Sequence, residues 1–140
     1  MSNDVVVIRR VIDAPRDEVF AAWLDPESVA QWMKPGDVSH ASAEIDPRVG
    51  GKFRIVMQHG RGDADHWGEY LAIDPPSLLS FTWISANTDR QSSVVTIELR
   101  EADGGTELTL THRRLPPDKV ASHNKGWSDI VRKLGETLAR

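Results

Sequence analysis

The chain has 140 residues, of which 39% are hydrophobic and 27% charged, with a net charge of −4 at neutral pH and no cysteine. A chain of this length can bury a core of its own, so we expect a single domain over residues 1–140. The lack of cysteine excludes disulfides, thiolate zinc sites and thiol catalysis, and the acidic balance argues against nucleic acid and anionic membranes as partners.

The first segment, DVVVIRRVI at residues 4–12, is rich in β-branched residues and predicts a strand. Its apolar run, Val5–Ile8, stops at two arginines. Such a run is far too short for a signal peptide or a membrane span. We therefore expect a cytoplasmic protein without a membrane partner.

Two short helices are predicted next, one over residues 16–24 and one that ends before Pro35. Asp25 separates them, because the proline that follows it disfavours helical geometry there. Asp25 can cap the second helix, and Pro26 fits its first position. The apolar faces of the two helices carry Val19, Phe20, Trp23, Val29, Trp32 and Met33.

Six strand-like segments, separated by turn-forming residues, fill the middle of the chain. They cover residues 38–46, 51–59, 66–74, 79–85, 92–101 and 105–114. Apolar residues alternate within them, as period-two burial requires: Phe53, Ile55 and Met57; Leu79, Phe81 and Trp83; Val95, Ile97 and Leu99; Leu108, Leu110 and His112. The pattern predicts an antiparallel meander with one apolar face that needs a cover.

A C-terminal amphipathic helix over residues 123–140 can supply that cover. The residues that we expect to face the sheet are Trp127, Ile130, Val131 and Leu134. Gly126 interrupts the helix beside its largest side chain, at a cost of about 1 kcal/mol relative to alanine. We expect this glycine to permit a close approach to a neighbouring element, so that leucine at this position destabilises the protein.

His112 is the most informative polar residue, because it extends the apolar face of its strand. It can serve as a hydrogen-bonding group or a base at the mouth of a cavity. The alternative is a histidine whose hydrogen bonds are satisfied at the edge of the core. Both interpretations remain open from the sequence.

Two other polar clusters permit a catalytic or a metal-binding interpretation. Glu44 and Asp46 share a strand face and could act as an acid–base pair, but a turn contact between Asp46 and Arg48 fits the sequence better. His59 and His66 flank a loop with two aspartates, yet their spacing matches no known metal pattern. We expect neither a metal nor a cofactor.

Several stretches together resemble one known family. They are IDAPRDEVFAAWLDPESVAQWMKP, EIDPRVGGKFR, GEYLAIDPPSLLSFTW, GGTELTLTHRRLP and the late GW pair. The chain thereby resembles activator-of-Hsp90-ATPase-like (AHSA1-like) domains of the SRPBCC, or START-like (Bet v 1-like), superfamily. The resemblance implies an α+β helix-grip fold, in which a curved seven-stranded antiparallel sheet surrounds the long C-terminal helix. It also implies two short helices between strands 1 and 2 and a cavity between the sheet and the long helix.

Our first hypothesis for the function is a binding protein for a small apolar or amphipathic molecule. Five of the nine aromatic residues are tryptophan, which suits a core or an apolar pocket. The expected ligand-binding residues are Trp23, Trp32, Phe53, Ile55, Met57, Phe81, Trp83, His112, Trp127 and Val131.

Two alternatives remain: a cyclase- or hydrolase-like enzyme that uses the cavity, and a chaperone-linked or homodimeric interaction domain. Full Hsp90 activators carry a separate N-terminal domain, for which 140 residues leave no room. We therefore do not expect Hsp90 itself as a partner.

Overall fold

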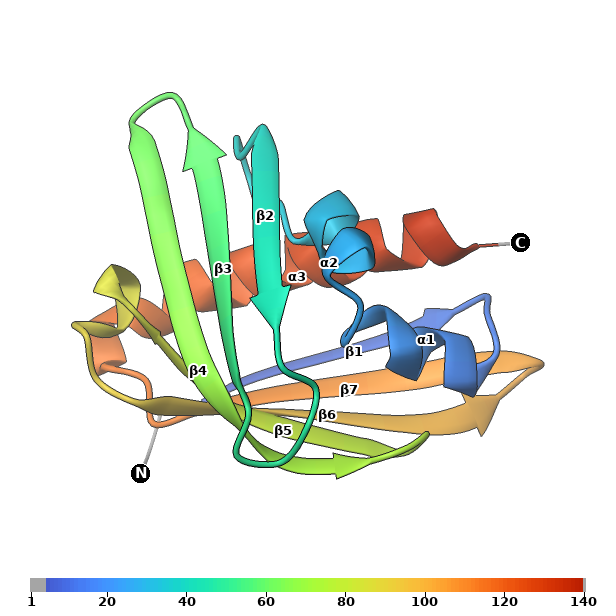
Figure 1. Cartoon of the computed structure of the whole chain (residues 1–140). Helices are drawn as coiled ribbons and strands as arrows, with labels where there is room; N and C mark the ends of the chain where they lie inside the picture. The colour runs from blue at the N-terminus through green and yellow to red at the C-terminus, as the bar shows by residue number, and fades with distance from the viewer. Residues whose placement is uncertain (1–4, 140) are drawn as a thin grey trace.

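A computed structural model, which describes residues 5–139, contains one seven-stranded antiparallel sheet with the strand order β1-β7-β6-β5-β4-β3-β2 (Figure 1). The strands are β1 (Val6–Ile12), β2 (His40–Ile45), β3 (Lys52–His59), β4 (Gly62–Asp74), β5 (Leu78–Ser85), β6 (Ser93–Ala102) and β7 (Gly105–Arg113). The helices are α1 (Arg16–Ala22), α2 (Pro26–Trp32) and α3 (Val120–Leu138), with single 3-10 turns η1 (Ala86–Thr88) and η2 (Pro117–Lys119). The predicted helix-grip fold is confirmed.

The sheet curls so that β2, β3 and β4 rise steeply from β1, β6 and β7, and α3 crosses the concave side (Figure 1). Helix α3 packs against β1 and α2, and α2 also packs against β2. The core lies between these layers. On α3, the four residues predicted to face the sheet are at most 3% exposed, which confirms that face of the helix: Trp127, Ile130, Val131 and Leu134.

Period-two alternation explains which side chains of the sheet face the core. Every residue of the four alternating triplets in β3, β5, β6 and β7 is buried, His112 included. The turn between β6 and β7 uses Asp103 and Gly104, both at positive φ (49° and 80°), as a two-residue hairpin requires. At α2, the side chain of Asp25 accepts a hydrogen bond from the backbone N–H of Glu27 at 3.0 Å, so the predicted cap is confirmed.

The clearest boundary error concerns β4, which begins at Gly62 rather than at residue 66. The segment that was expected to be a loop continues the β3–β4 hairpin, whose turn is Gly60-Arg61. Its aspartates are strand residues, and Asp65 accepts two hydrogen bonds of 3.0 Å from Arg54 on β3. The side chains at this end of β4 face solvent and are polar, so the sequence shows no apolar alternation that would predict a strand there. Helix α3 also begins three residues earlier than predicted, at Val120.

The expectation that Gly126 permits a close approach is wrong. A Cβ atom at this position would lie 3.9 Å from Cβ of Pro35, which is an ordinary van der Waals distance. A tight position is found instead at Gly68 on β4, where a Cβ atom would lie 2.0 Å from the carbonyl oxygen of Thr82 and 2.7 Å from the ring of Phe53. Gly68 therefore leaves room for the neighbouring strand and for a core ring.

Substitution of alanine for glycine should change the free energy of unfolding in opposite directions at these two positions. Gly68→Ala should lower the free energy of unfolding by about 2–3 kcal/mol, because the methyl group collides with backbone. Gly126→Ala should raise it by about 0.5–1 kcal/mol, because alanine favours the helix and meets no obstacle. Urea unfolding of both variants measures the two changes. A Gly126→Ala variant less stable than the wild type would contradict this account.

Candidate functional site

A cavity of about 280 Å³ lies between the N-terminal half of α3 and the sheet. The sheet contributes Met57 from β3, His66 from β4 and Trp83 from β5. The rest of the wall comes from α3, η1 and the α2–β2 loop: Pro35, Gly36, Asn87, Ser122, His123, Lys125, Gly126, Trp127, Asp129 and Ile130. The deeper wall is apolar and aromatic, and the exposed polar residues stand at the mouth.

Two indole rings form the deep end of this cavity. Trp83 and Trp127 are 3% and 2% exposed, and their ring centroids lie 5.0 Å apart with an interplanar angle of 55°. Trp127 also contacts Trp23 from the C-terminal end of α1, at a centroid distance of 6.4 Å. Tilted ring pairs at these distances are favourable, so the two indoles hold a fixed position.

A buried hydrogen-bond chain joins the indole of Trp127 to the backbone of Trp83. Nε1 of Trp127 donates to Nδ1 of His112 at 2.9 Å. Nε2 of His112 and the hydroxyl of Ser93 lie 2.7 Å apart, and that hydroxyl donates to the carbonyl oxygen of Trp83 at 2.6 Å. An indole N–H can only donate and a carbonyl can only accept. The proton of His112 therefore resides on Nε2 and is donated to Ser93.

The environment of His112 also keeps its ring uncharged. Burial, and to a smaller extent the neighbouring His123, lowers the pKa of His112 to about 3. Both ring nitrogens are occupied, and the side chain is fully buried. The structure thus supports a histidine with satisfied hydrogen bonds that anchors Trp127, and it leaves no free nitrogen for a base.

Two further histidines belong to the wall of the cavity. Burial lowers the pKa of His66 to about 4, against a smaller opposing effect of the Ile55 and Ala64 carbonyls. Its ring centroid is 5.0 Å from that of Trp83, and its buried Nδ1 makes no hydrogen bond. His123 donates from Nδ1 to the carbonyl of Lys119 at 2.8 Å, and burial lowers its pKa as well.

Hydrogen bonds fix both sides of the mouth. On one side, the backbone N–H of Gly36 donates to Asp129 of α3 at 2.6 Å, and this bond is the main reason why the pKa of Asp129 is lowered. On the other side, Nδ2 of Asn87 in η1 donates to the hydroxyl of Ser122 at 3.2 Å. The loop before β2 and the turn after β5 are thereby attached to the same helix.

The structure separates the ten residues that the sequence grouped as one site. Met57, Trp83 and Trp127 line the 280 Å³ cavity. Four others surround, with Trp83, an internal void of only about 10 Å³: Trp23, Phe53, Ile55 and Phe81. The remaining three are buried in the core away from both spaces: Trp32, His112 and Val131. Most of the space between helix and sheet is therefore filled by side chains.

Sequence reasoning missed several cavity residues, and their signals differ. His123 lies four residues before Trp127, so the helical period placed it on the buried stripe. His66 lies on the same strand face as Gly68 and Tyr70, but as the first residue of the predicted strand 66–74 it was considered only as a metal ligand. Asn87 comes from η1, inside an expected turn, and nothing in the sequence marks it as a cavity residue.

The other polar clusters have structural roles. Nε of Arg48 donates to Asp46 at 2.9 Å, as the turn interpretation predicted. His59 accepts a hydrogen bond from the backbone N–H of Arg61 in the hairpin turn. Within residues 5–139, no three histidine or carboxylate side chains come together as metal ligands. No helix in this part of the chain has the length and apolar character needed to cross a membrane.

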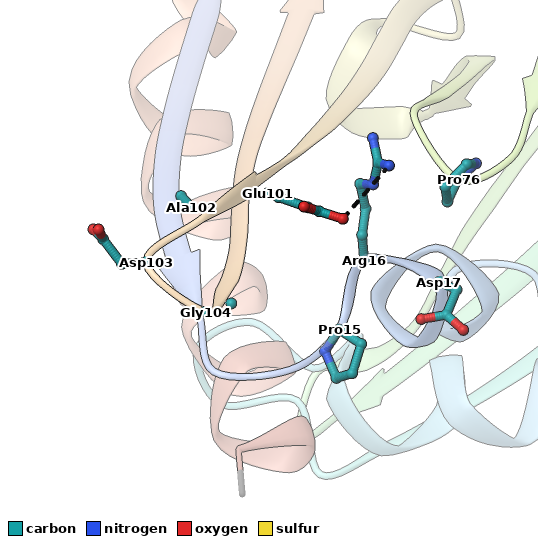
Figure 2. Close-up of a pocket in the computed structure, with 9 residues that line it drawn as sticks. Pro15, Arg16, Asp17, Pro76, Glu101, Ala102, Asp103 and Gly104 are labelled. Atoms are coloured by element: carbon teal, nitrogen blue, oxygen red, sulfur yellow. Dashed lines mark ion pairs between the residues drawn. The ribbon is translucent and has the colours of Figure 1, made fainter.

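A larger hollow, of about 570 Å³, lies between the start of α1 and the β6–β7 hairpin (Figure 2). Figure 2 shows Arg16 with its guanidinium directed toward Glu101, at an N–O distance of 3.9 Å. Arg16 also donates to the hydroxyl of Ser77 at 3.2 Å. This hollow has no aromatic wall, so the smaller cavity beside α3 suits an apolar ligand better.

Comparison with known proteins gives three kinds of match. The family model described as "Activator of Hsp90 ATPase homolog 1-like protein" matches residues 13–139. The uncharacterized protein C1711.08 of Schizosaccharomyces pombe is 29% identical over 105 residues, which make up 74% of this chain but only 28% of that protein.

Many solved structures share the fold over nearly the whole chain, and two serve as examples. Protein CV1439 of Chromobacterium violaceum has 22% identity and a TM-score of 0.84, with 99% of both chains covered. DynU16, described as a protein of the dynemicin biosynthetic locus, has 27% identity and a TM-score of 0.79. That match covers 98% of this chain and 48% of DynU16.

The buried histidines predict a loss of stability in mild acid. Their pKa values are near 6.5 in the unfolded chain and lower in the folded one, so protonation favours unfolding. The free energy of unfolding is therefore unaffected by protonation of these histidines above pH 6.5. Below pH 6.5 it falls by up to about 1.4 kcal/mol per pH unit for each histidine. Urea unfolding at pH 7 and pH 5 should therefore give a free energy of unfolding several kcal/mol lower at pH 5.

The variant His66→Gln should lose less stability over the same pH range, by up to about 2 kcal/mol, because one titrating group is removed. Equal losses in variant and wild type would show that His66 is not held uncharged by the fold.

Proposed function

The chain belongs to the Activator of Hsp90 ATPase homolog 1-like family, and on this premise we propose that it binds a small apolar or amphipathic molecule in the cavity beside α3. The observation that carries the proposal is the cavity itself, whose deep wall is formed by Met57, Trp83, Trp127 and Ile130. A concave apolar wall with a few polar groups at its edge is the usual construction of a small-molecule site. Its volume of about 280 Å³ suits a molecule of one or two rings.

The likeness to DynU16 supports a small-molecule ligand. That protein is described as part of a biosynthetic locus, and this chain is 27% identical to it. Of the ten residues grouped from the sequence, we assign ligand contact to Met57, Trp83 and Trp127. Of the other seven, four surround the 10 Å³ void behind Trp83, and three lie in the core away from both spaces.

The expected affinity is modest. A ligand that buries about 200 Å² of apolar surface gains about 5 kcal/mol before the costs of association are subtracted. Before those costs, a gain of about 5 kcal/mol corresponds to a dissociation constant of about 0.2 mM, so we expect constants in the millimolar range.

An enzyme that transfers protons in this cavity is a second candidate, and His66 is the observation that favours it. An uncharged imidazole with an unbonded nitrogen can accept a proton from a bound molecule. However, burial lowers the pKa of His66 to about 4, which makes it a weak base at neutral pH. Binding is therefore the function that the geometry supports best.

Gly126 provides a direct test, because its missing side chain leaves part of the cavity open. Leucine at this position should fill the space and abolish binding, while the helix gains about 0.8 kcal/mol from the loss of glycine. The measurement is the shift of the Trp83 and Trp127 indole ¹H–¹⁵N signals during titration with medium-chain fatty acids, steroids and aromatic metabolites. The matched control is Ser128→Leu, which adds the same side chain at an exposed position of α3.

At least one compound should move both indole signals in the wild type and in Ser128→Leu, and none should move them in Gly126→Leu. The proposal fails if no compound moves these signals in the wild type, or if Gly126→Leu binds as well as the control does.

A further inference from the structure

The mouth of the 280 Å³ cavity carries two opposite charges on α3, and only the negative one is neutralised by the protein. The carboxylate of Asp129 accepts a hydrogen bond from the backbone N–H of Gly36 at 2.6 Å. It also binds the guanidinium of Arg132 and lies 3.7 Å from Nζ of Lys133. Lys125 is exposed and lines the cavity, but its ammonium group pairs with no residue in the described part of the chain. The mouth therefore offers one free positive charge.

The position of Lys125 on α3 places it at the centre of this mouth. Ser122, Lys125 and Asp129 follow one another at spacings of three and four residues, so they lie on one side of the helix. Ser122 is bound to Asn87 of η1, and Asp129 is bound to Gly36 of the α2–β2 loop. Lys125 thus stands between the two contacts that attach the mouth to α3. Its flexible four-carbon side chain can follow a charged group at the opening.

The deeper wall requires the opposite chemistry. Its apolar side chains are at most 4% exposed: Met57, Trp83, Trp127 and Ile130. An ionised group against this wall would lose its hydration without meeting an opposite charge, which is costly. At the mouth the same group keeps part of its hydration and lies near Lys125. A molecule with one apolar end and one anionic end therefore satisfies both parts of the cavity.

We propose that the ligand of this cavity is an amphipathic monoanion, with its apolar end beside Trp83 and Trp127 and a carboxylate at the mouth, and that Lys125 selects it by charge. This inference rests on the proposed binding function. The preference is small, because water and salt screen an exposed ion pair. At low ionic strength, we expect an anion to bind about threefold more tightly than a neutral analogue.

The test compares three ligands that share a phenyl ring and differ in the charge of the head group: 3-phenylpropionate, 3-phenylpropionamide and 3-phenylpropylamine. Dissociation constants come from ligand-observed NMR at pH 7 and low salt, and the indole signals of Trp83 and Trp127 locate the bound ring. In the wild type, the carboxylate should bind about threefold more tightly than the amide, and the ammonium ligand should bind most weakly. Salt at about 0.3 M should remove most of this preference.

Two variants at Lys125 and one control assign the preference to this side chain. Lys125→Gln should remove the preference, and Lys125→Glu should reverse it, so that the ammonium ligand binds most tightly. The matched control is Lys52→Glu, which makes the same change in net charge at an exposed position of β3 outside the cavity wall. It should leave the order of the three ligands unchanged. Thermal unfolding of each variant checks that it is folded.

Three results would overturn the inference. If the wild type binds the three ligands equally, if both Lys125 variants keep the wild-type order, or if Lys52→Glu changes that order as much as Lys125→Glu does, Lys125 does not select the ligand, although the cavity still binds it. If the ammonium ligand binds most tightly to the wild type, the mouth recognises a cation through Asp129. If none of the three ligands moves the indole signals, the proposed binding function fails for aromatic ligands, and the inference fails with it.

Discussion

The structure depends on one buried hydrogen-bond chain that joins the long helix to the sheet. It runs from the indole of Trp127 on α3 through His112 on β7 and Ser93 on β6 to the backbone carbonyl of Trp83 on β5. Each group in the chain has a single role, because the first can only donate and the last can only accept. The chain therefore determines where α3 lies along the concave face. It also demands that His112 stay uncharged.

This arrangement explains why the protein has a cavity at one end and a filled core at the other. With Trp127 held against Trp83, the rings of Trp23, Phe53 and Phe81 close the space behind them to a void of about 10 Å³. In front of the two indoles, the glycine at position 126 adds no side chain, and about 280 Å³ remains open. The same interaction that stabilises the fold thus builds the deep wall of the proposed site.

The sequence predicted what depends on local periodicity and missed what depends on pairing in space. Alternation placed His112 on the inner face, and the helical stripe placed Trp127 against the sheet; both are confirmed. Their contact spans 15 residues and two elements, so no spacing rule could reveal it. The position of the cavity was equally hidden, because it depends on which side chains fill the space. His66 was considered only as a metal ligand, because the polar residues before it look like a loop, although they form an exposed strand end.

The most direct test of this account is the protonation state of His112 in solution. In a sample labelled with ¹⁵N-histidine, the imidazole nitrogen shifts should show an uncharged ring with its proton on Nε2. A coupling across the hydrogen bond should connect Nδ1 to the indole proton of Trp127. The ring should stay uncharged at pH 5, because burial lowers its pKa to about 3. A proton on Nδ1, or a charged ring near pH 6, would contradict the proposed chain and the position of α3 that it determines.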